Sequence, residues 1–304
     1  MKRITTYARS ALALLLGERC VVCGCVSTGA DVCPKCLLKL PYINIRGVAN
    51  DMIERLFWGA LPIVRASSML EYAPNNSAQL LLESIKYKGR SDIAVKMGCM
   101  MGESLIRRGF FEGIDCIQPV PLHPNRRMQR GYNQSEELAR GIAEVARLPI
   151  VDLVRRTTDN VSQTKLSHTE RIGNVKDIFA PNTAEIQRLR PHHILFVDDV
   201  ITTGSTLISC VQAIVGKPEE RSKIIEAIRN QADKHGLSHD NHGEESMSGQ
   251  TATTPPLTPK ISVLSLAYAG KLCPGFRTPE ELHHPLQLES NKHFRNLQQR
   301  PFLR

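Results

Sequence analysis

The sequence predicts an α/β fold in which helices flank a largely parallel sheet. Three short apolar segments carry this prediction, because Ile114–Val120, Ile194–Val197 and Ile261–Ala267 each have the pattern of a buried strand. Amphipathic segments at Ala78–Tyr87 and Ser91–Arg108 have the spacing of helices that cover such a sheet. Strands that alternate with helices are typical of parallel βα units.

Composition allows a folded core and favours an anionic partner. The chain has 304 residues, enough for one medium domain and a small module, and 41% of them are hydrophobic. Its formal charge of +9 suits a nucleic acid or a phosphorylated metabolite, although many soluble proteins carry such a charge without either partner.

No segment has the length of a membrane span. Basic residues before Ala11–Leu16 superficially resemble a signal peptide, but Arg9 adjoins the run and no cleavage motif follows. We therefore expect an amphipathic first helix in a cytoplasmic protein.

Two CxxC pairs stand near the N-terminus and predict a structural metal site. The ligands would be Cys20, Cys23, Cys33 and Cys36. Four thiolates suit tetrahedral zinc and leave no open position for catalysis. Cys25 could replace Cys23, and a redox role would need only one pair in a βαβ context that is absent here. Three further cysteines, Cys99, Cys116 and Cys210, lie in apolar surroundings typical of buried thiols.

An acid pair follows the most apolar strand candidate, in the stretch ILFVDDVITTGST at 194–206. Asp198 and Asp199 come directly before a turn rich in hydroxyl groups, formed by Thr202, Thr203, Gly204, Ser205 and Thr206. Backbone amides and hydroxyls of such a turn can hold a phosphate, and the helix that opens after it favours an anion. Open α/β sheets bind ligands at this end of a strand. The arrangement suits a phosphorylated sugar, whereas a core strand with a polar turn would leave the adjacent acids unexplained.

Basic residues gather in two other segments. The sequence Lys86-Tyr87-Lys88-Gly89-Arg90 could contact phosphates or stack on a base, although a solvated helix end is the simpler account. The segment after Ile114–Val120 is predicted as a loop that carries Arg126, Arg127 and Arg130. Arginines at the carboxyl end of a strand could grip a diphosphate by bidentate contacts. Asn133 and Glu136 then have the spacing of a helix capping box.

The order of these motifs resembles the ComF family. It consists of the CxxC pairs, KYKGR, VPLHPNRRMQRGYNQ, RRTTDNVSQTKLSHTERIGNV and VDDVITTGST, and it covers Cys20 to about Leu207 and again Ile261–Ala269. The acid-pair stretch alone resembles the motif with which type I phosphoribosyltransferases bind 5-phosphoribosyl 1-diphosphate (PRPP). The resemblance implies a zinc-binding N-terminal module joined to a type I phosphoribosyltransferase domain. It also implies an association with natural transformation, in which bacteria handle imported single-stranded DNA.

The resemblance also implies roles for particular residues. Asp198 and Asp199 would fix the ribose, the turn 202–206 would hold the 5′-phosphate, and Arg126 or Arg127 would contact pyrophosphate with the backbone near His123. Magnesium would be held mainly by pyrophosphate and ribose oxygens. The segment Leu153–Phe179 would close over PRPP as a hood, with the cations Arg155, Arg156, Lys165 and Arg171. If the protein is instead a DNA-binding factor, its surface for single-stranded DNA would comprise Lys86, Tyr87, Lys88, Arg90 and Arg130, together with the rest of the Arg126–Arg130 loop and the zinc module. No residue stands out as a catalytic base, and His123 is a candidate by position only.

The expected organisation has four parts. Residues 1–50 form the zinc module, 51–90 a connector with a basic helix, 91–269 the phosphoribosyltransferase-like domain, and 270–304 a C-terminal tail. Residues 216–260 are an insertion whose Ser-, His- and Pro-rich part is expected to be disordered. Three hypotheses of function follow: an active phosphoribosyltransferase, a non-catalytic single-stranded-DNA-binding factor that acts with DNA-uptake proteins, or a PRPP-sensing regulator, for which no helix-turn-helix is evident.

Overall fold

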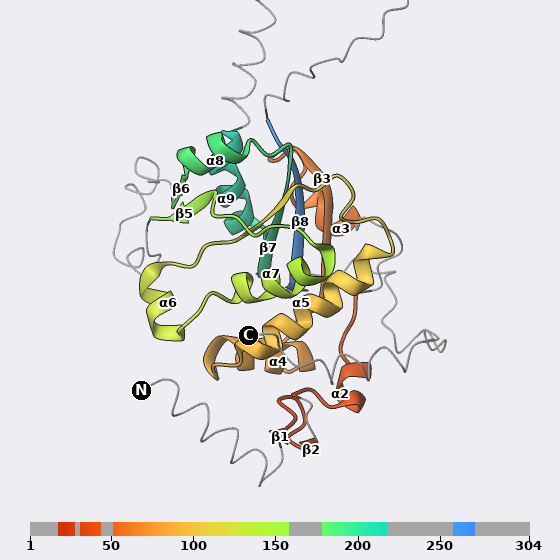
Figure 1. Ribbon diagram of the computed structural model, residues 1–304. Helices are drawn as coiled ribbons and strands as arrows, with labels where there is room; N and C mark the ends of the chain where they lie inside the picture. The colour runs from red at the N-terminus through yellow and green to blue at the C-terminus, as the bar shows by residue number, and fades with distance from the viewer. Residues whose placement is uncertain (1–17, 28–30, 44–50, 158–177, 218–257, 271–304) are drawn as a thin grey trace, which may run out of the picture.

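The structure, a computed structural model, describes residues 18–27, 31–43, 51–157, 178–217 and 258–270 (Figure 1). The predicted N-terminal helix at Ala11–Leu16, most of the insertion 216–260 and almost all of the tail 270–304 lie outside the described residues.

A four-stranded sheet forms the centre of the molecule, in the order β3 (Ile63–Glu71), β8 (Lys260–Tyr268), β7 (His193–Ile201) and β4 (Cys116–Pro119). All three pairings are parallel, which confirms the predicted parallel α/β sheet. The edge strand β3 was not predicted, and it lies in the segment expected to be a connector. Parallel pairing directs the carboxyl ends of these strands to one edge of the sheet, where β7 places the two acids.

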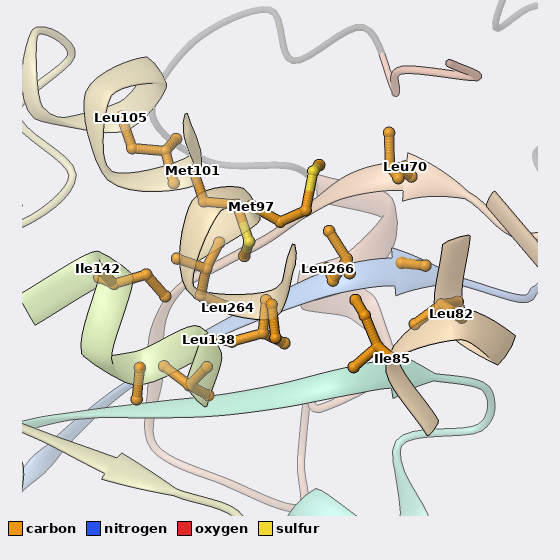
Figure 2. Close-up of a cluster of buried hydrophobic side chains, with 14 of the residues drawn as sticks. Leu70, Leu82, Ile85, Met97, Met101, Leu105, Leu138, Ile142, Leu264 and Leu266 are labelled. Atoms are coloured by element: carbon orange, nitrogen blue, oxygen red, sulfur yellow. The ribbon is translucent and has the colours of Figure 1, made fainter. Parts of the chain in front are cut away.

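Both faces of the sheet are covered, because successive side chains of a strand point to opposite sides. Leu195 and Val197 face one apolar cluster, whereas Ile194 and Phe196 face the other. The first cluster lies under three helices, α4 (Ser77–Tyr87), α5 (Ser91–Ile106) and α7 (Gln134–Ala146). The second lies under α3 (Asp51–Arg55) and α9 (Ser205–Val215) (Figure 1). In Figure 2, side chains of α5 and α7 meet over Leu264 and Leu266 of β8.

Helices α5 and α7 pack closely because glycines face each other at their contact. A Cβ atom added to Gly141 would lie 2.0 Å from the carbonyl oxygen of Val95, and one added to Gly98 would lie 2.2 Å from the carbonyl oxygen of Leu138. Neither position can hold a larger residue without moving a helix. This close packing sets where α7 begins, next to the end of β7.

The arginine-bearing segment after β4 is a helix, α6 (Pro124–Arg130), and the prediction of a loop was wrong. Pro124 occupies the first helical position, where its missing N–H costs nothing, and the Nδ1 atom of His123 accepts a hydrogen bond from Asn125 N at 3.2 Å. Gly131 ends the helix with φ 86°. Too short to show an apolar period, the helix could not be found by hydrophobic pattern. The capping geometry also gives His123 a structural role.

Smaller elements complete the described fold. The cysteine segment contains β1 (Glu18–Arg19), β2 (Val26–Ser27) and α2 (Pro34–Leu38), and a second antiparallel pair, β5 (Val154–Arg156) and β6 (Phe179–Pro181), precedes α8 (Thr183–Leu189). Trp58 is 57% exposed with Arg55 over its ring, while neighbouring Phe57 is fully buried. Cys116 and Cys210 are buried as predicted, whereas Cys99 is partly exposed.

Candidate functional site

The acid pair lies inside β7 and not after it, because the strand continues to Ile201. Asp198 Oδ1 accepts hydrogen bonds from Ser135 Oγ at 3.0 Å and from Asp199 N at 2.8 Å. Asp199 Oδ2 forms an ion pair with Lys86 Nζ at 3.1 Å. Burial raises the pKa of Asp198 to about 7, and the adjacent Asp199 carboxylate acts in the same direction. The site therefore holds one carboxylate neutralised by lysine and a second whose charge is disfavoured.

The turn after β7 is a tight glycine turn at the N-terminus of α9. Gly204 has φ 76° and directly precedes α9, and an added Cβ would lie 3.0 Å from the ring of buried Phe57. Only glycine fits this position without strain. Thr203 Oγ1 donates to Ser205 Oγ at 3.1 Å, so these hydroxyls lie together at the helix start.

A small recess lies between Asp198 and this turn. It has a volume of about 20 Å³ and is lined in part by Thr202, Gly204, Ser205 and Thr206. That volume holds about one water molecule. The recess is therefore too small for a phosphate group, and the threonine and serine side chains of the turn are exposed at its mouth.

Two basic segments that are separate in the sequence meet in one cavity of about 250 Å³. It is lined by Lys86, Tyr87, Arg126, Gln129 and Arg130, which come from the end of α4 and from α6. Since Lys86 also pairs with Asp199, the cavity adjoins the acid pair. Sequence reasoning assigned these cations to two different ligands, and the structure brings them together.

Three of the predicted basic residues lie elsewhere. Arg127 NH2 pairs with Glu136 Oε2 of α7 at 3.0 Å and does not line the cavity. Arg90 forms ion pairs with Asp92, at 2.7 Å, and with Asp31 in the cysteine segment. Lys88 is exposed and also stands outside the cavity lining.

The hood candidates are only partly described. Arg155 is exposed and pairs with Asp152 at 3.3 Å, and Arg156 stacks on the ring of Phe179 at 5.5 Å. Lys165 and Arg171 lie outside the described residues. The ends of the hood segment therefore form the paired strands β5 and β6, whose Val154 and Phe179 join the apolar cluster under α9.

Four cysteines come together as the spacing predicted. The Sγ atoms of Cys20, Cys23, Cys33 and Cys36 all lie within 4.8 Å of one another. Sulfurs around tetrahedral zinc would be about 3.8 Å apart, given Zn–S bonds of about 2.3 Å. The donor set fits, so this cluster could bind zinc. Cys25 Sγ lies 3.2 Å from Cys23 Sγ, beside the cluster.

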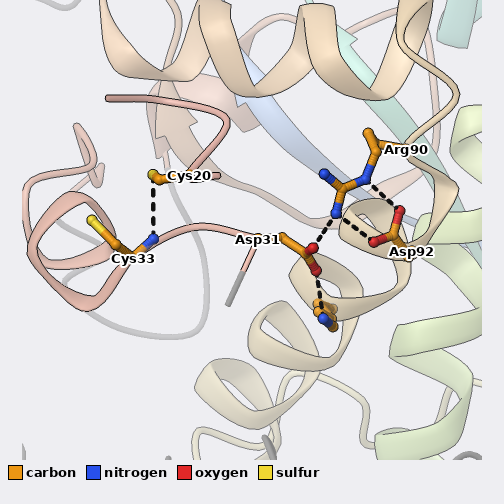
Figure 3. Close-up of polar contacts among 6 residues, drawn as sticks. Cys20, Asp31, Cys33, Arg90 and Asp92 are labelled. Atoms are coloured by element: carbon orange, nitrogen blue, oxygen red, sulfur yellow. Dashed lines mark hydrogen bonds and ion pairs between the residues drawn. The ribbon is translucent and has the colours of Figure 1, made fainter. Parts of the chain in front are cut away.

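An ion-pair network connects the cysteine segment to α5, and sequence reasoning missed it. Asp31 lies two residues before Cys33 and is 5% exposed. It forms ion pairs with both Arg90 and Lys96 (Figure 3). Arg90 also holds Asp92 through two hydrogen bonds, of 3.0 and 2.7 Å. Sequence analysis also missed Ser135 and Gln129 at the candidate site. No local signal marks such residues, since each acts through a partner far along the chain.

No helix among the described residues combines the length and apolar character that a membrane span requires.

The chain is similar to proteins whose names refer to competence and to DNA utilization. No protein-family model matches the chain. It is 28% identical over 212 residues to "DNA utilization protein YhgH" of Escherichia coli (strain K12), an alignment that covers 68% of this chain and 88% of that protein. It is 25% identical over 211 residues to "Competence protein ComFC" of Streptococcus pneumoniae (strain ATCC BAA-255 / R6), covering 68% and 86%.

A shorter match is more similar. The chain is 35% identical over 94 residues to "Competence protein F" of Haemophilus influenzae (strain ATCC 51907 / DSM 11121 / KW20 / Rd), which covers 31% of this chain and 41% of that protein. Together with the motif order and the parallel sheet, these homologues support the assignment of the chain to the ComF family.

Proposed function

We propose that the protein binds PRPP with magnesium and transfers its phosphoribosyl group to an acceptor during DNA uptake or use. The single observation that carries the proposal is the pairing of two carboxylates at the end of β7 with a hydroxyl-rich turn at the start of α9. The acid pair also adjoins a cationic cavity, because Asp199 pairs with Lys86 of its lining. A sugar with a 5′-phosphate and a 1-diphosphate offers one group to each element: its 5′-phosphate to the turn, its hydroxyls to the acids and its diphosphate to the cations.

The described residues divide the task between them. Asp198 and Asp199 accept hydrogen bonds from the ribose hydroxyls, and the turn from Thr202 to Thr206 holds the 5′-phosphate. Arg126 and Lys86 stand where the diphosphate would extend. When PRPP binds, the ion pair between Lys86 and Asp199 weakens because Lys86 also contacts the phosphates. Magnesium would supply charge neutralisation for the leaving pyrophosphate, held mainly by oxygens of PRPP itself.

The link to DNA comes from the relatives, whose names refer to competence and to DNA utilization. A non-catalytic single-stranded-DNA-binding factor is the alternative that one observation favours, because the cationic cavity contains an exposed tyrosine on which a base can stack. A PRPP-sensing regulator would use the same pocket without turnover.

Calorimetry with PRPP and magnesium tests the binding proposal. The wild type should bind, and the double variant Asp198→Asn plus Asp199→Asn should not, while circular dichroism shows that both are folded. Absence of PRPP uptake by the folded wild type would refute the proposal.

Catalysis needs a separate test, in which pyrophosphate release from PRPP is measured with nucleobases, nucleotides and single-stranded DNA as acceptors. If none releases pyrophosphate although PRPP binds, the enzymatic part fails and the sensor or DNA-binding alternatives stand. Retention of single-stranded-DNA binding by the double variant would show that the two activities are separable.

A further inference from the structure

The cavity between α4 and α6 differs in chemistry from the sugar-phosphate turn. Three cations line it, and no carboxylate does so among the described residues. Tyr87, which also lines it, keeps 72% of its surface exposed although its ring packs under a guanidinium. Exposed aromatic rings between cations are the pattern with which proteins hold nucleobases and their phosphates.

Arg130 is held in a fixed orientation that aims at this cavity. Its guanidinium carbon lies 5.5 Å from the centroid of the Tyr87 ring, and its NH1 donates to Gln134 Oε1 at 3.0 Å. Only one of its five N–H donors is thereby used among the described residues. Because the Tyr87 ring and the Gln134 side chain already restrict this guanidinium, it loses little conformational entropy when it binds a phosphate or stacks on a base.

The size of the cavity limits the ligand to one small unit. A volume of about 250 Å³ corresponds to the liquid volume of roughly eight water molecules and falls just below the range of typical ligand pockets. One base with its phosphate at the rim fits this space, whereas several nucleotides of a strand do not.

We propose that the Tyr87 side of this cavity is a seat for a single nucleotide unit, with its base against Tyr87 and its phosphate at Arg130, while Lys86 and Arg126 face the PRPP diphosphate. The unit is either a free mononucleotide or one nucleotide of a single strand. Lys86 connects the seat to Asp199, so the nucleotide lies beside the acid pair. Its identification as the partner of PRPP rests on the proposed function, whereas the seat itself does not.

The test measures binding of thymidine 5′-monophosphate and of a twelve-residue oligothymidylate by calorimetry, with PRPP and magnesium titrated in parallel. Tyr87→Leu should weaken mononucleotide binding about fivefold or more, because base stacking contributes about 1–3 kcal/mol. Tyr87→Trp should retain it, and PRPP affinity should change less than about twofold. Met128→Ala is the matched control, since Met128 is exposed on α6 but does not line the cavity.

The salt dependence of binding distinguishes a free mononucleotide from a nucleotide within a single strand. Binding of an oligonucleotide that contacts several cations falls steeply with salt, whereas binding of the mononucleotide falls slightly. If only the oligonucleotide binds and Tyr87→Leu weakens that binding, the ligand of the seat is a nucleotide within a single strand.

Other results overturn the proposal. If Tyr87→Leu leaves the binding of both the mononucleotide and the oligonucleotide unchanged, Tyr87 does not hold the base and the proposal is refuted. Equal weakening of nucleotide and PRPP binding by Tyr87→Leu would make Tyr87 part of the PRPP site, which refutes a distinct nucleotide seat while the proposed function stands. Tyr87-dependent nucleotide binding by a wild type that never takes up PRPP would instead refute the proposed function and leave the seat.

Discussion

Replacement of Asp31 by asparagine should loosen the cysteine segment from α5. The asparagine side chain has the same shape, so the backbone hydrogen bond from Val21 N to the residue 31 carbonyl, 2.9 Å long, can persist. What the variant removes is the buried negative charge that both Arg90 and Lys96 approach. The perturbation is therefore electrostatic and local.

The expected loss is about 2 kcal/mol of unfolding free energy. Removal of one partner from a buried ion pair typically costs about 3–5 kcal/mol. Two features of the structure reduce this value. Arg90 keeps its two hydrogen bonds to Asp92, and Lys96 is 48% exposed, so water can solvate it in the variant. A loss of this size is large against a typical total stability of about 5–15 kcal/mol.

Urea unfolding measures the loss, and a chromogenic chelator measures the rate at which the protein releases zinc. Both should change in Asp31→Asn, because the network holds the residues that precede Cys33. Asp152→Asn is the matched control: it breaks an exposed pair with Arg155 and should change neither measurement. A loss below about 0.5 kcal/mol with unchanged zinc release would refute the reasoning, because Asp31 would then behave as a surface charge.

Three further predictions follow from the site and the packing. Burial and the Asp199 charge raise the pKa of Asp198 from 3.8 to about 7, so the folded state binds a proton that the unfolded state has lost. Stability should therefore fall as pH rises from about 4 to about 7, and urea unfolding of Asp198→Asn should show a smaller fall. Gly141→Ala should destabilise the protein in thermal unfolding by about 2 kcal/mol or more, because a contact of 2.0 Å with a backbone oxygen outweighs the gain of up to about 1 kcal/mol in helix propensity. In metal analysis, Cys33→Ser should lose zinc and Cys25→Ser should keep it, since only Cys33 belongs to the four-sulfur cluster; the reverse result would exchange their roles.

Much of the fold was predictable because its signals are local. The strands at β4, β7 and β8 show as short apolar runs, and the helices at α4 and α5 show as amphipathic ones. Helix α6 was mistaken for a loop because seven residues are too few for a periodic pattern. Strand β3 was missed among the proline and glycine signals around it. Local sequence patterns also could not predict its pairing with β8, because β8 lies near the opposite end of the chain.

The sequence by itself determined the chemical inventory: two carboxylates before a glycine-centred turn, four thiols in two pairs, and clusters of cations. Only the tertiary structure decided which of them meet. Ser135 reaches Asp198 across 63 residues, Arg90 reaches Asp31 across 59, and Lys86 leaves its basic cluster to pair with Asp199. The reason is physical. Turn geometry and periodicity arise from neighbours a few residues apart, whereas an ion pair between distant segments depends on strand order and helix packing.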